Sequence, residues 1–508
     1  MNEESQGFAN EFVRFMREMH QIVELDEGAR RSTLRTMLDE FLGVDSSALP
    51  VVSDAYEPFE HVNVQVALNA YLEGEGRTHE LVGIAGGYRH DGSFSDLLEV
   101  HIQRLGRSGS VEYRNLPTGP HDTIPCIMFG LLLISEGGRR VALLLRAPNP
   151  NHGMRHRIEL EATSADEAWS RELLESLRAL TLELNVFRGQ VVSFGHGNEF
   201  DHRSAGPIVF FERPDIQADE LILPATANAA IEAQVFGIEQ HRDRLLASGQ
   251  HLKRGLLLHG PPGTGKTLTV RYLTGRLTGH TVVLLAGGNL GQIGAACGLA
   301  RLLQPSVVVM EDVDLVAMER SYGYGGGPVL FEVLNQMDGL EEDANVVFLL
   351  TTNRADLLEP ALAARPGRVD LALEIPLPDA GARHQLVELY GRGIDLRLED
   401  PDRVVERTVG VTASFVKELM RKASLLAALA TAEDVGETIV VTDAEVNAAL
   451  DELMSEETSL TRRLLGGAAS DDSPSRPGTE WLGTYRPGGA GWTSYVEGSE
   501  GGVWVDPD

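Results

Sequence analysis

Apolar residues near the start of the chain recur at three- and four-residue steps. This spacing runs from Phe8 to Val23 and returns from Leu34 to Phe41. A period close to 3.6 residues places apolar side chains along one face of a helix. The pattern therefore predicts a pair of amphipathic helices within residues 1–43.

The pattern then changes to alternation, because every second residue from 62 to 68 is valine or leucine. A period of two predicts a strand. Farther along, Glu-Gly-Gly at 136–138 separates the apolar runs 127–134 and 141–145. Two apolar runs joined by such a short glycine turn predict a β-hairpin.

Helical spacing returns at the leucines between residues 173 and 180 and predicts one more helix. Strands are expected around Val191 and at Ile208–Phe211. Residues 1–200 are thus expected to form an α+β domain, and they contain no recognisable catalytic constellation.

After residue 254 short apolar runs alternate with helical stretches, as a parallel sheet covered by helices requires. We expect an α/β domain at 201–378 and a mainly helical one at 379–460. The final helix should begin at Thr442, which has a capping-box glutamate three residues later. The five expected strands are 256–258, 282–285, 307–310, 346–350 and 371–375.

Composition narrows the class of protein. The chain of 508 residues carries a net charge of −31. Roughly three domains are expected at this length, and the charge argues against nucleic-acid partners. The longest apolar run, 126–134, is too short to cross a bilayer, so we expect no transmembrane segment and a cytoplasmic protein. The acidic segment 461–508, rich in glycine, proline and serine, is expected to be disordered.

Candidate chemistry begins at residues 260–267, Gly-Pro-Pro-Gly-Thr-Gly-Lys-Thr, which follow an expected strand and open an expected helix. This context predicts a phosphate-binding loop, or Walker A motif, for ATP. Lys266 would reach the β- and γ-phosphates, and Thr267 would give its hydroxyl to Mg²⁺. The expected ATP-contacting residues are Gly260, Pro261, Pro262, Gly263, Thr264, Gly265, Lys266, Thr267 and Leu268.

Two further strand ends carry polar groups that suit hydrolysis. Glu311 and Asp312 follow the apolar run 307–310, and Asn353 follows 346–350. One carboxylate would hold the water shell of the metal and the other would orient the attacking water. Asn353 is expected to hold that water near the γ-phosphate.

With these motifs in order, residues 220–455 resemble the AAA-type module of the AAA+ superfamily. The resemblance also includes 334–340, 352–354, 360–362, Arg365-Pro-Gly-Arg368 and 376–379. It implies a P-loop module with a five-stranded parallel sheet and a helical lid, behind the N-terminal α+β domain. It also implies a homo-oligomeric ring, usually a hexamer, in which Arg368 of one subunit touches the γ-phosphate held by its neighbour.

The chain departs from the family pattern at several points. The usual Asp-Glu order is reversed to Glu311-Asp312, as in the mitochondrial AAA proteins that translocate folded Rieske iron-sulfur proteins. With the strand register kept, Glu311 faces the metal and Asp312 the water. An extra alanine at 363–364 leaves either Arg365 or Arg368 as the arginine finger.

The expected pore segment is also unusual. Residues 287–304 are short and lack the aromatic pore residue of typical unfoldases, offering Leu290, Gln292 and Ile293 instead. The first hypothesis is a chaperone-like ring ATPase whose N-terminal domain recruits a protein client or adaptor. The alternative is a nucleotide-gated assembly scaffold or switch with slow hydrolysis.

Overall fold

The computed structural model describes residues 33–85, 92–98, 107–148, 157–195, 208–314, 335–336, 339, 344–356, 369–430 and 438–455. The chain divides into two compact units, 1–468 and 469–508. The helix expected between residues 8 and 23 and the expected disordered tail lie outside the described residues. All of the described residues belong to the first unit.

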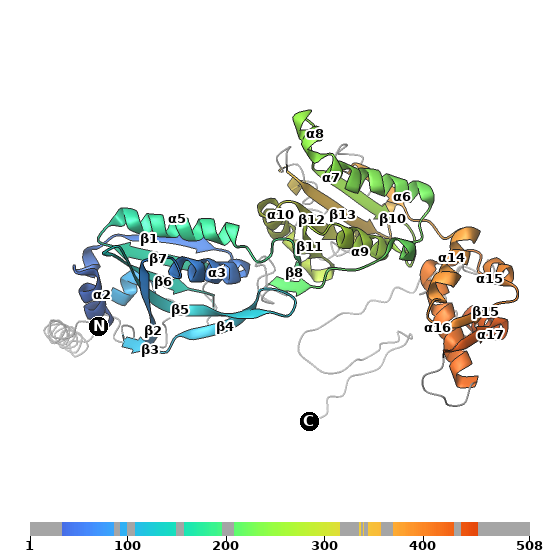
Figure 1. Cartoon of the computed structure of the whole chain (residues 1–508), viewed down its shortest axis with the longest axis horizontal. Coiled ribbons are helices and arrows are strands. Elements are labelled where there is room, and N and C mark those ends of the chain that lie inside the picture. Colours follow the sequence, from blue (N-terminus) through green and yellow to red (C-terminus); the bar gives the residue numbers. More distant parts are fainter. Residues whose placement is uncertain are drawn as a thin grey trace, which may run out of the picture. The chain divides into compact units, whose positions relative to one another are not determined.

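The N-terminal part is an antiparallel sheet with helices on both faces (Figure 1). Its strand order is β1-β7-β6-β5-β2-β3, and β4 pairs with β5. The strands are β1 (Val51–Tyr56), β2 (Arg77–Ala85), β3 (Arg107–Gly109), β4 (Glu112–Pro117), β5 (Thr123–Glu136), β6 (Arg139–Arg146) and β7 (Ile158–Ser164). The helices are α2 (Thr33–Leu42), α3 (His61–Leu72), α4 (Phe94–Leu98) and α5 (Glu167–Glu183).

Packing on both faces explains the continuous apolar runs of β5 and β6. Helices α3 and α5 share one core with alternate residues of these strands, and α2 and α4 share another with the remaining residues. The hairpin predicted between β5 and β6 is confirmed, and its turn places Gly137 and Gly138 at φ 57° and 84°. Positive φ at both turn residues matches the right-handed twist of the strands and favours glycine. The predicted helices α2 and α5 are also confirmed.

The strand expected at 62–68 is wrong, because these residues lie in α3. Nine of its twelve residues are buried, including the polar ones that create the alternation. Gln65 Oε1 accepts a hydrogen bond from Ile127 N at 2.9 Å, and Asn63 Oδ1 accepts one from Val186 N at 2.8 Å. Because these polar side chains are buried and hydrogen-bonded, only a narrow strip of the helix that includes Asn69 faces solvent, and the sequence shows no clear helical period.

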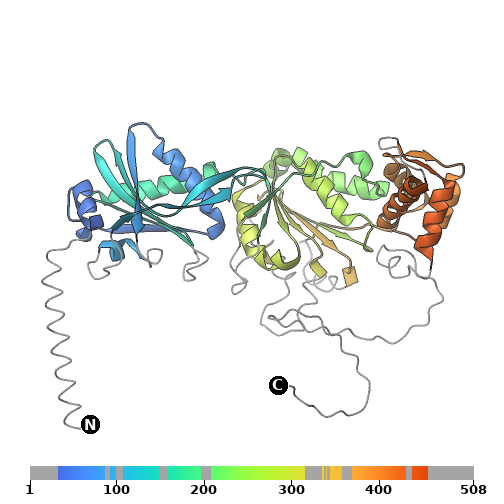
Figure 2. The same cartoon turned by 90° about the horizontal axis from the view of Figure 1, so that it is seen from below.

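The second sheet has the order β14-β10-β13-β12-β11-β8-β9. The five predicted parallel strands are confirmed as β10 (Arg254–His259), β11 (Thr281–Leu285), β12 (Ser306–Met310), β13 (Val346–Thr352) and β14 (Leu371–Glu374). Helices cover both faces (Figure 2). They are α6 (Ala225–Ile231), α7 (Ile238–Gln240), α8 (Arg242–Ala247), α9 (Lys266–Arg276) and α10 (Ile293–Leu302), with a π-helical turn at Glu232–Gly237.

Two strands from earlier in the chain extend this sheet. β8 (Val191–Phe194) pairs in parallel with β11, and β9 (Ile208–Phe211) pairs antiparallel with β8. The domain boundary expected at residue 200 therefore falls between two strands of one sheet. Phe187, Val192 and Phe194 belong to the same buried core as α10.

The residues after β14 form a helical subdomain around a short parallel strand pair (Figure 1). Its elements are α14 (Ala380–Tyr390), β15 (Asp395–Arg397), α15 (Pro401–Arg407), α16 (Ala413–Ala430), β16 (Val440–Thr442) and α17 (Asp443–Met454). The predicted capping box is confirmed at the start of α17. Thr442 Oγ1 accepts from Ala444 N, and Glu445 Oε2 accepts from Thr442 N at 2.9 Å.

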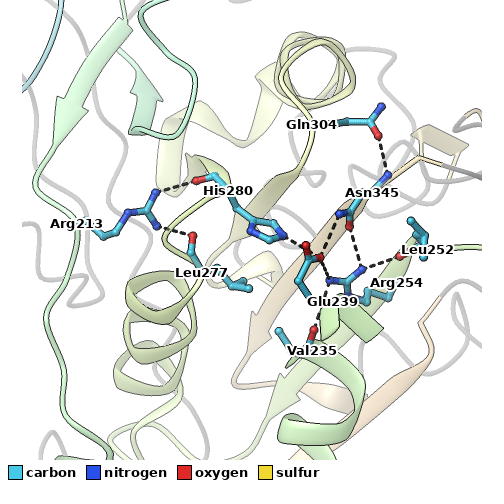
Figure 3. Close-up of polar contacts among 9 residues, drawn as sticks. All are labelled: Arg213, Val235, Glu239, Leu252, Arg254, Leu277, His280, Gln304 and Asn345. Carbon is cyan, nitrogen blue, oxygen red and sulfur yellow. Dashed lines mark hydrogen bonds and ion pairs between the residues drawn. The ribbon is translucent and has the colours of Figure 1, made fainter. Parts of the chain in front are cut away.

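A buried polar network joins the amino ends of the central strands (Figure 3). Glu239 of α7 lies 3.3 Å from both Arg254 Nη2 and His280 Nε2, and it accepts from Asn345 Nδ2 at 3.1 Å. The hydrogen bond with His280, together with Asn345 and Arg254, lowers the pKa of Glu239 to about 2. The charge of Glu239 therefore contributes stability above pH 4.5 that is lost as the pH falls toward 2.

Glu239→Ala is expected to lower the free energy of unfolding of this sheet by about 3–5 kcal/mol, because it removes the carboxylate that is hydrogen-bonded to the buried guanidinium of Arg254. Arg254 is only 2% exposed. Faster amide hydrogen exchange in β10 and β13 would report the loss. Adding Arg254→Met should recover part of it, and Glu167→Ala, in an exposed ion pair with Arg171, is the matched control. A double variant less stable than Glu239→Ala would contradict this account.

Candidate nucleotide site

The loop between β10 and α9 has a backbone that only glycine tolerates well. Gly260, Gly263 and Gly265 have φ values of 142°, 79° and 106°. A Cβ on Gly260 would also lie 2.3 Å from the carbonyl oxygen of Ile375. These residues let the loop curve tightly at the carboxyl end of β10, where the amino end of α9 begins.

Lys266 points its ammonium group into the curve of this loop. Its Nζ donates to the carbonyl oxygens of Gly260 at 2.9 Å and Pro261 at 2.8 Å. Burial lowers the pKa of Lys266, and the carboxylates of Asp312 and Asp314 oppose that shift. A cation held by a glycine loop at a helix amino end fits a polyphosphate, which would replace the two carbonyl oxygens as its partner.

Glu311 lies directly after β12 and faces the start of α9. Its side chain is hydrogen-bonded with Thr267, and this bond partly offsets the rise that burial causes in the pKa of Glu311. A carboxylate and a hydroxyl side by side are oxygen ligands of the kind that Mg²⁺ and its water shell prefer. These two residues would hold the metal, and its positive charge would offset the negative charge of the phosphates.

Asp312, the next residue, faces a different neighbour. Asn353 follows β13, and its Nδ2 donates to Asp312 Oδ1 at 3.1 Å. Asp312 itself has φ 52°, the left-handed region, and its backbone N donates to Thr351 Oγ1 at 3.0 Å. Adjacent carboxylates therefore meet different partners, Thr267 for Glu311 and Asn353 for Asp312.

The structure thus brings together Lys266, Thr267, Glu311, Asp312 and Asn353 at the carboxyl edge of the sheet. The remaining residues of the predicted loop, Pro262, Thr264 and Leu268, lie in or beside the same turn, and Thr264 Oγ1 donates to Pro261 O at 2.9 Å. Both candidate fingers, Arg365 and Arg368, lie outside the described residues.

Sequence reasoning missed two parts of this site. Asp314 accepts hydrogen bonds from Thr352 and Asn353, although it belongs to the same acidic run as Glu311. Ser414 N, at the start of α16, donates to Gly263 O at 3.0 Å, which joins the helical subdomain to the phosphate loop. The two residues are 151 positions apart in the chain, so no local sequence pattern indicates that they are in contact.

The residues offered for the pore segment face inward instead. Leu290 and Ile293 are 1% and 0% exposed and belong to the core beneath α10. Gln292 is also buried. None of the three is available to grip a chain, because their side chains are committed to packing.

Comparison with known proteins agrees with this geometry. Residues 256–377 match the ATPase family associated with various cellular activities (AAA). The sheet order, the phosphate loop and this match define an AAA-type ATPase module, and hydrolysis of ATP is the reaction of such a module.

Among the curated proteins similar to this chain are three bacterial ones. ATP-dependent zinc metalloprotease FtsH 3 of Symbiobacterium thermophilum is 32% identical over 211 residues, 39% of this chain and 33% of the relative. FtsH 4 of Sphaerobacter thermophilus is 32% identical over 267 residues, 49% of this chain and 40% of the relative. FtsH of Nitrosococcus oceani is 35% identical over 195 residues, 35% of this chain and 30% of the relative.

The chain therefore spans only about a third of the length of the relatives it matches. Within the described ranges, no group of three or more His, Cys, Asp or Glu side chains is placed to hold a metal ion. No helix in that part of the chain is long and apolar enough to cross a membrane.

Proposed function

We propose that this chain is the subunit of a homo-oligomeric ring, a hexamer by its family resemblance, that uses ATP hydrolysis to remodel a protein client. The observation that carries the proposal is the convergence of Lys266, Thr267, Glu311, Asp312 and Asn353 at one sheet edge. Glu311 would hold the Mg²⁺ shell, and Asp312 would take the proton of the attacking water.

The junction between the N-terminal sheet and the ATPase sheet supports a mechanical role. The rings of Phe59 and Phe194 lie 5.5 Å apart, edge to face, and Asn63 accepts a hydrogen bond from Val186 N. Val62 and Cys126 belong to the same buried core as β8, β11 and α10. A client or adaptor bound by residues 33–185 would therefore be linked to the nucleotide site through packed side chains.

The trans contact of the ring is assigned to Arg368, or to Arg365 if the extra alanine shifts the register. Either guanidinium would stabilise charge on the γ-phosphate of the neighbouring subunit. The reversed order Glu311-Asp312 resembles AAA proteins that translocate folded clients. That likeness remains a prediction, and the relatives named above are FtsH proteins.

A second candidate is a nucleotide-gated scaffold or switch. It is favoured by the buried Leu290, Gln292 and Ile293, because a threading motor needs residues that face a channel. In a switch, ATP binding alone would change the affinity for a partner. In a remodelling enzyme, the partner changes state only when ATP is turned over.

The deciding experiment uses a partner protein that co-purifies with the full chain, and it measures how ATP changes the amide exchange and the binding of that partner. With wild type, ATP is expected to raise the partner's amide exchange several-fold and to release it, and the partner should stimulate ATP hydrolysis. Asp312→Asn is expected to hold the partner with ATP bound and leave its exchange unchanged. Equal release by both chains, with no stimulation of hydrolysis, would replace the remodelling proposal with the switch.

A further inference from the structure

Asp314 is a buried carboxylate beside the nucleotide site that the proposed hydrolysis does not use. It is 5% exposed. Its Oδ1 accepts a hydrogen bond from Thr352 Oγ1 at 2.8 Å and another from Asn353 N at 3.2 Å. Burying a charged group is costly unless such bonds offset the cost. This position therefore requires a side chain that can accept both hydrogen bonds.

A second pair of contacts ties the same two strand ends together. Thr351 Oγ1 accepts from Asp312 N, and Asp312 adopts a left-handed backbone at φ 52°. Aspartate adopts this conformation more readily than most residues other than glycine, and the bond to Thr351 holds it here. The ends of β12 and β13 are therefore joined at Asp312 and again at Asp314.

These contacts converge on one geometric result, the meeting of the Asn353 amide with the Asp312 carboxylate at 3.1 Å. Asp314 holds the backbone of Asn353, and Thr352 is fixed both by Asp314 and by the N–H of Arg354, at 2.9 Å. If this turn moved, the Asn353 side chain would move with it. Misplacement of a catalytic group by about 1 Å can cost on the order of 100-fold in rate.

We infer that Asp314 is a positioning residue for ATP hydrolysis, which holds Thr352 and Asn353 so that the Asn353 amide orients Asp312. The inference rests on the proposed roles of Asp312 and Asn353. Asp314 would act through its acceptor oxygen and not through its negative charge, because both hydrogen bonds to Oδ1 come from uncharged donors.

The first test compares Asp314→Ala with Asp314→Asn. The alanine variant is expected to lower kcat about 10- to 100-fold, with the Kd for ATP within about threefold of wild type. Asparagine keeps an oxygen in place of Oδ1 and should remain within about fivefold of wild type. Equal loss in both variants would overturn the inference, because the charge would then be what matters. A raised Kd with unchanged kcat would overturn it too and point to an effect on Lys266.

The second test asks whether Asp314 acts through Asn353. In an Asn353→Ala background, Asp314→Ala is expected to lower kcat by less than about threefold further, because its target is already gone. Additive losses would overturn the inference. If Asp314→Ala fails to fold, Thr352→Val removes one of the two donors at nearly constant volume. It should lower kcat at unchanged ATP affinity, and wild-type turnover would count against the inference.

Assaying Asp312→Asn in parallel distinguishes the proposed role of Asp312 in hydrolysis from the positioning role of Asp314. Wild-type turnover in that variant would remove Asp312 from the reaction and the role of Asp314 with it. An inactive Asp312→Asn beside a fully active Asp314→Ala would overturn the role of Asp314 alone.

Discussion

Lys266→Ala is expected to abolish ATP binding, raising the Kd at least about 100-fold. Lys266 is 6% exposed, and its ammonium group lies inside the phosphate loop, where it donates to the carbonyl oxygens of Gly260 and Pro261. Charge-assisted hydrogen bonds to phosphate contribute about 1.5–3 kcal/mol each, and alanine removes all of them. Titration with a fluorescent ATP analogue measures the change directly.

The matched control for that variant is Lys253→Ala. Lys253 lies at the opposite end of β10, directly before Arg254, and should leave ATP affinity unchanged. Melting of Lys266→Ala without nucleotide should stay close to wild type, because the loss of two hydrogen bonds is offset by removal of a charge that is costly to bury. Wild-type ATP affinity in Lys266→Ala would remove the phosphate-loop assignment.

Asp312→Asn is expected to leave ATP binding intact while hydrolysis falls about 10²- to 10⁴-fold, the range for a lost general base. The amide keeps an oxygen that can accept the hydrogen bond of Asn353, so the geometry should survive. Subunits should then accumulate as ATP-loaded rings, seen by light scattering as a larger species. Turnover is measured by phosphate release with saturating ATP.

Glu311→Gln is the companion variant in that experiment. It should raise the Mg²⁺ concentration needed for activity, because Glu311 meets Thr267 rather than Asn353. If the two variants exchanged their phenotypes, the strand register assumed for the carboxylates would be off by one residue. Full activity of Asp312→Asn would exclude it from the reaction.

Much of this site could be predicted because its parts are local in sequence. The phosphate loop at 260–267 and the carboxylate pair after an apolar strand can each be recognised from a stretch of about ten residues. That β10 to β14 form a parallel sheet could be predicted from the alternation of apolar runs and helices, although the order of the strands could not. What local pattern cannot convey is a partner far along the chain, such as Ser414 for Gly263 or Val186 for Asn63.

The misread helix α3 has the same physical origin. His61 Nε2 lies 2.8 Å from the carbonyl oxygen of Ile127, so this polar residue is buried. The hydrophobic pattern, by contrast, predicts that a polar residue faces solvent. Burial leaves the pKa of His61 near 4, which keeps the ring neutral at physiological pH. Only the tertiary contact distinguishes this helix from a half-buried strand.

The pairing of β8 with β11 limits where the ATPase module can be excised from the chain. A truncated protein that starts at residue 201 would lack Val191–Phe194 and would expose an open sheet edge at β11. It would also lose Phe187, Val192 and Phe194 from the core against α10 and deprive β9 of its partner. The smallest fragment that preserves the sheet must therefore begin between the end of α5 at Glu183 and Phe187.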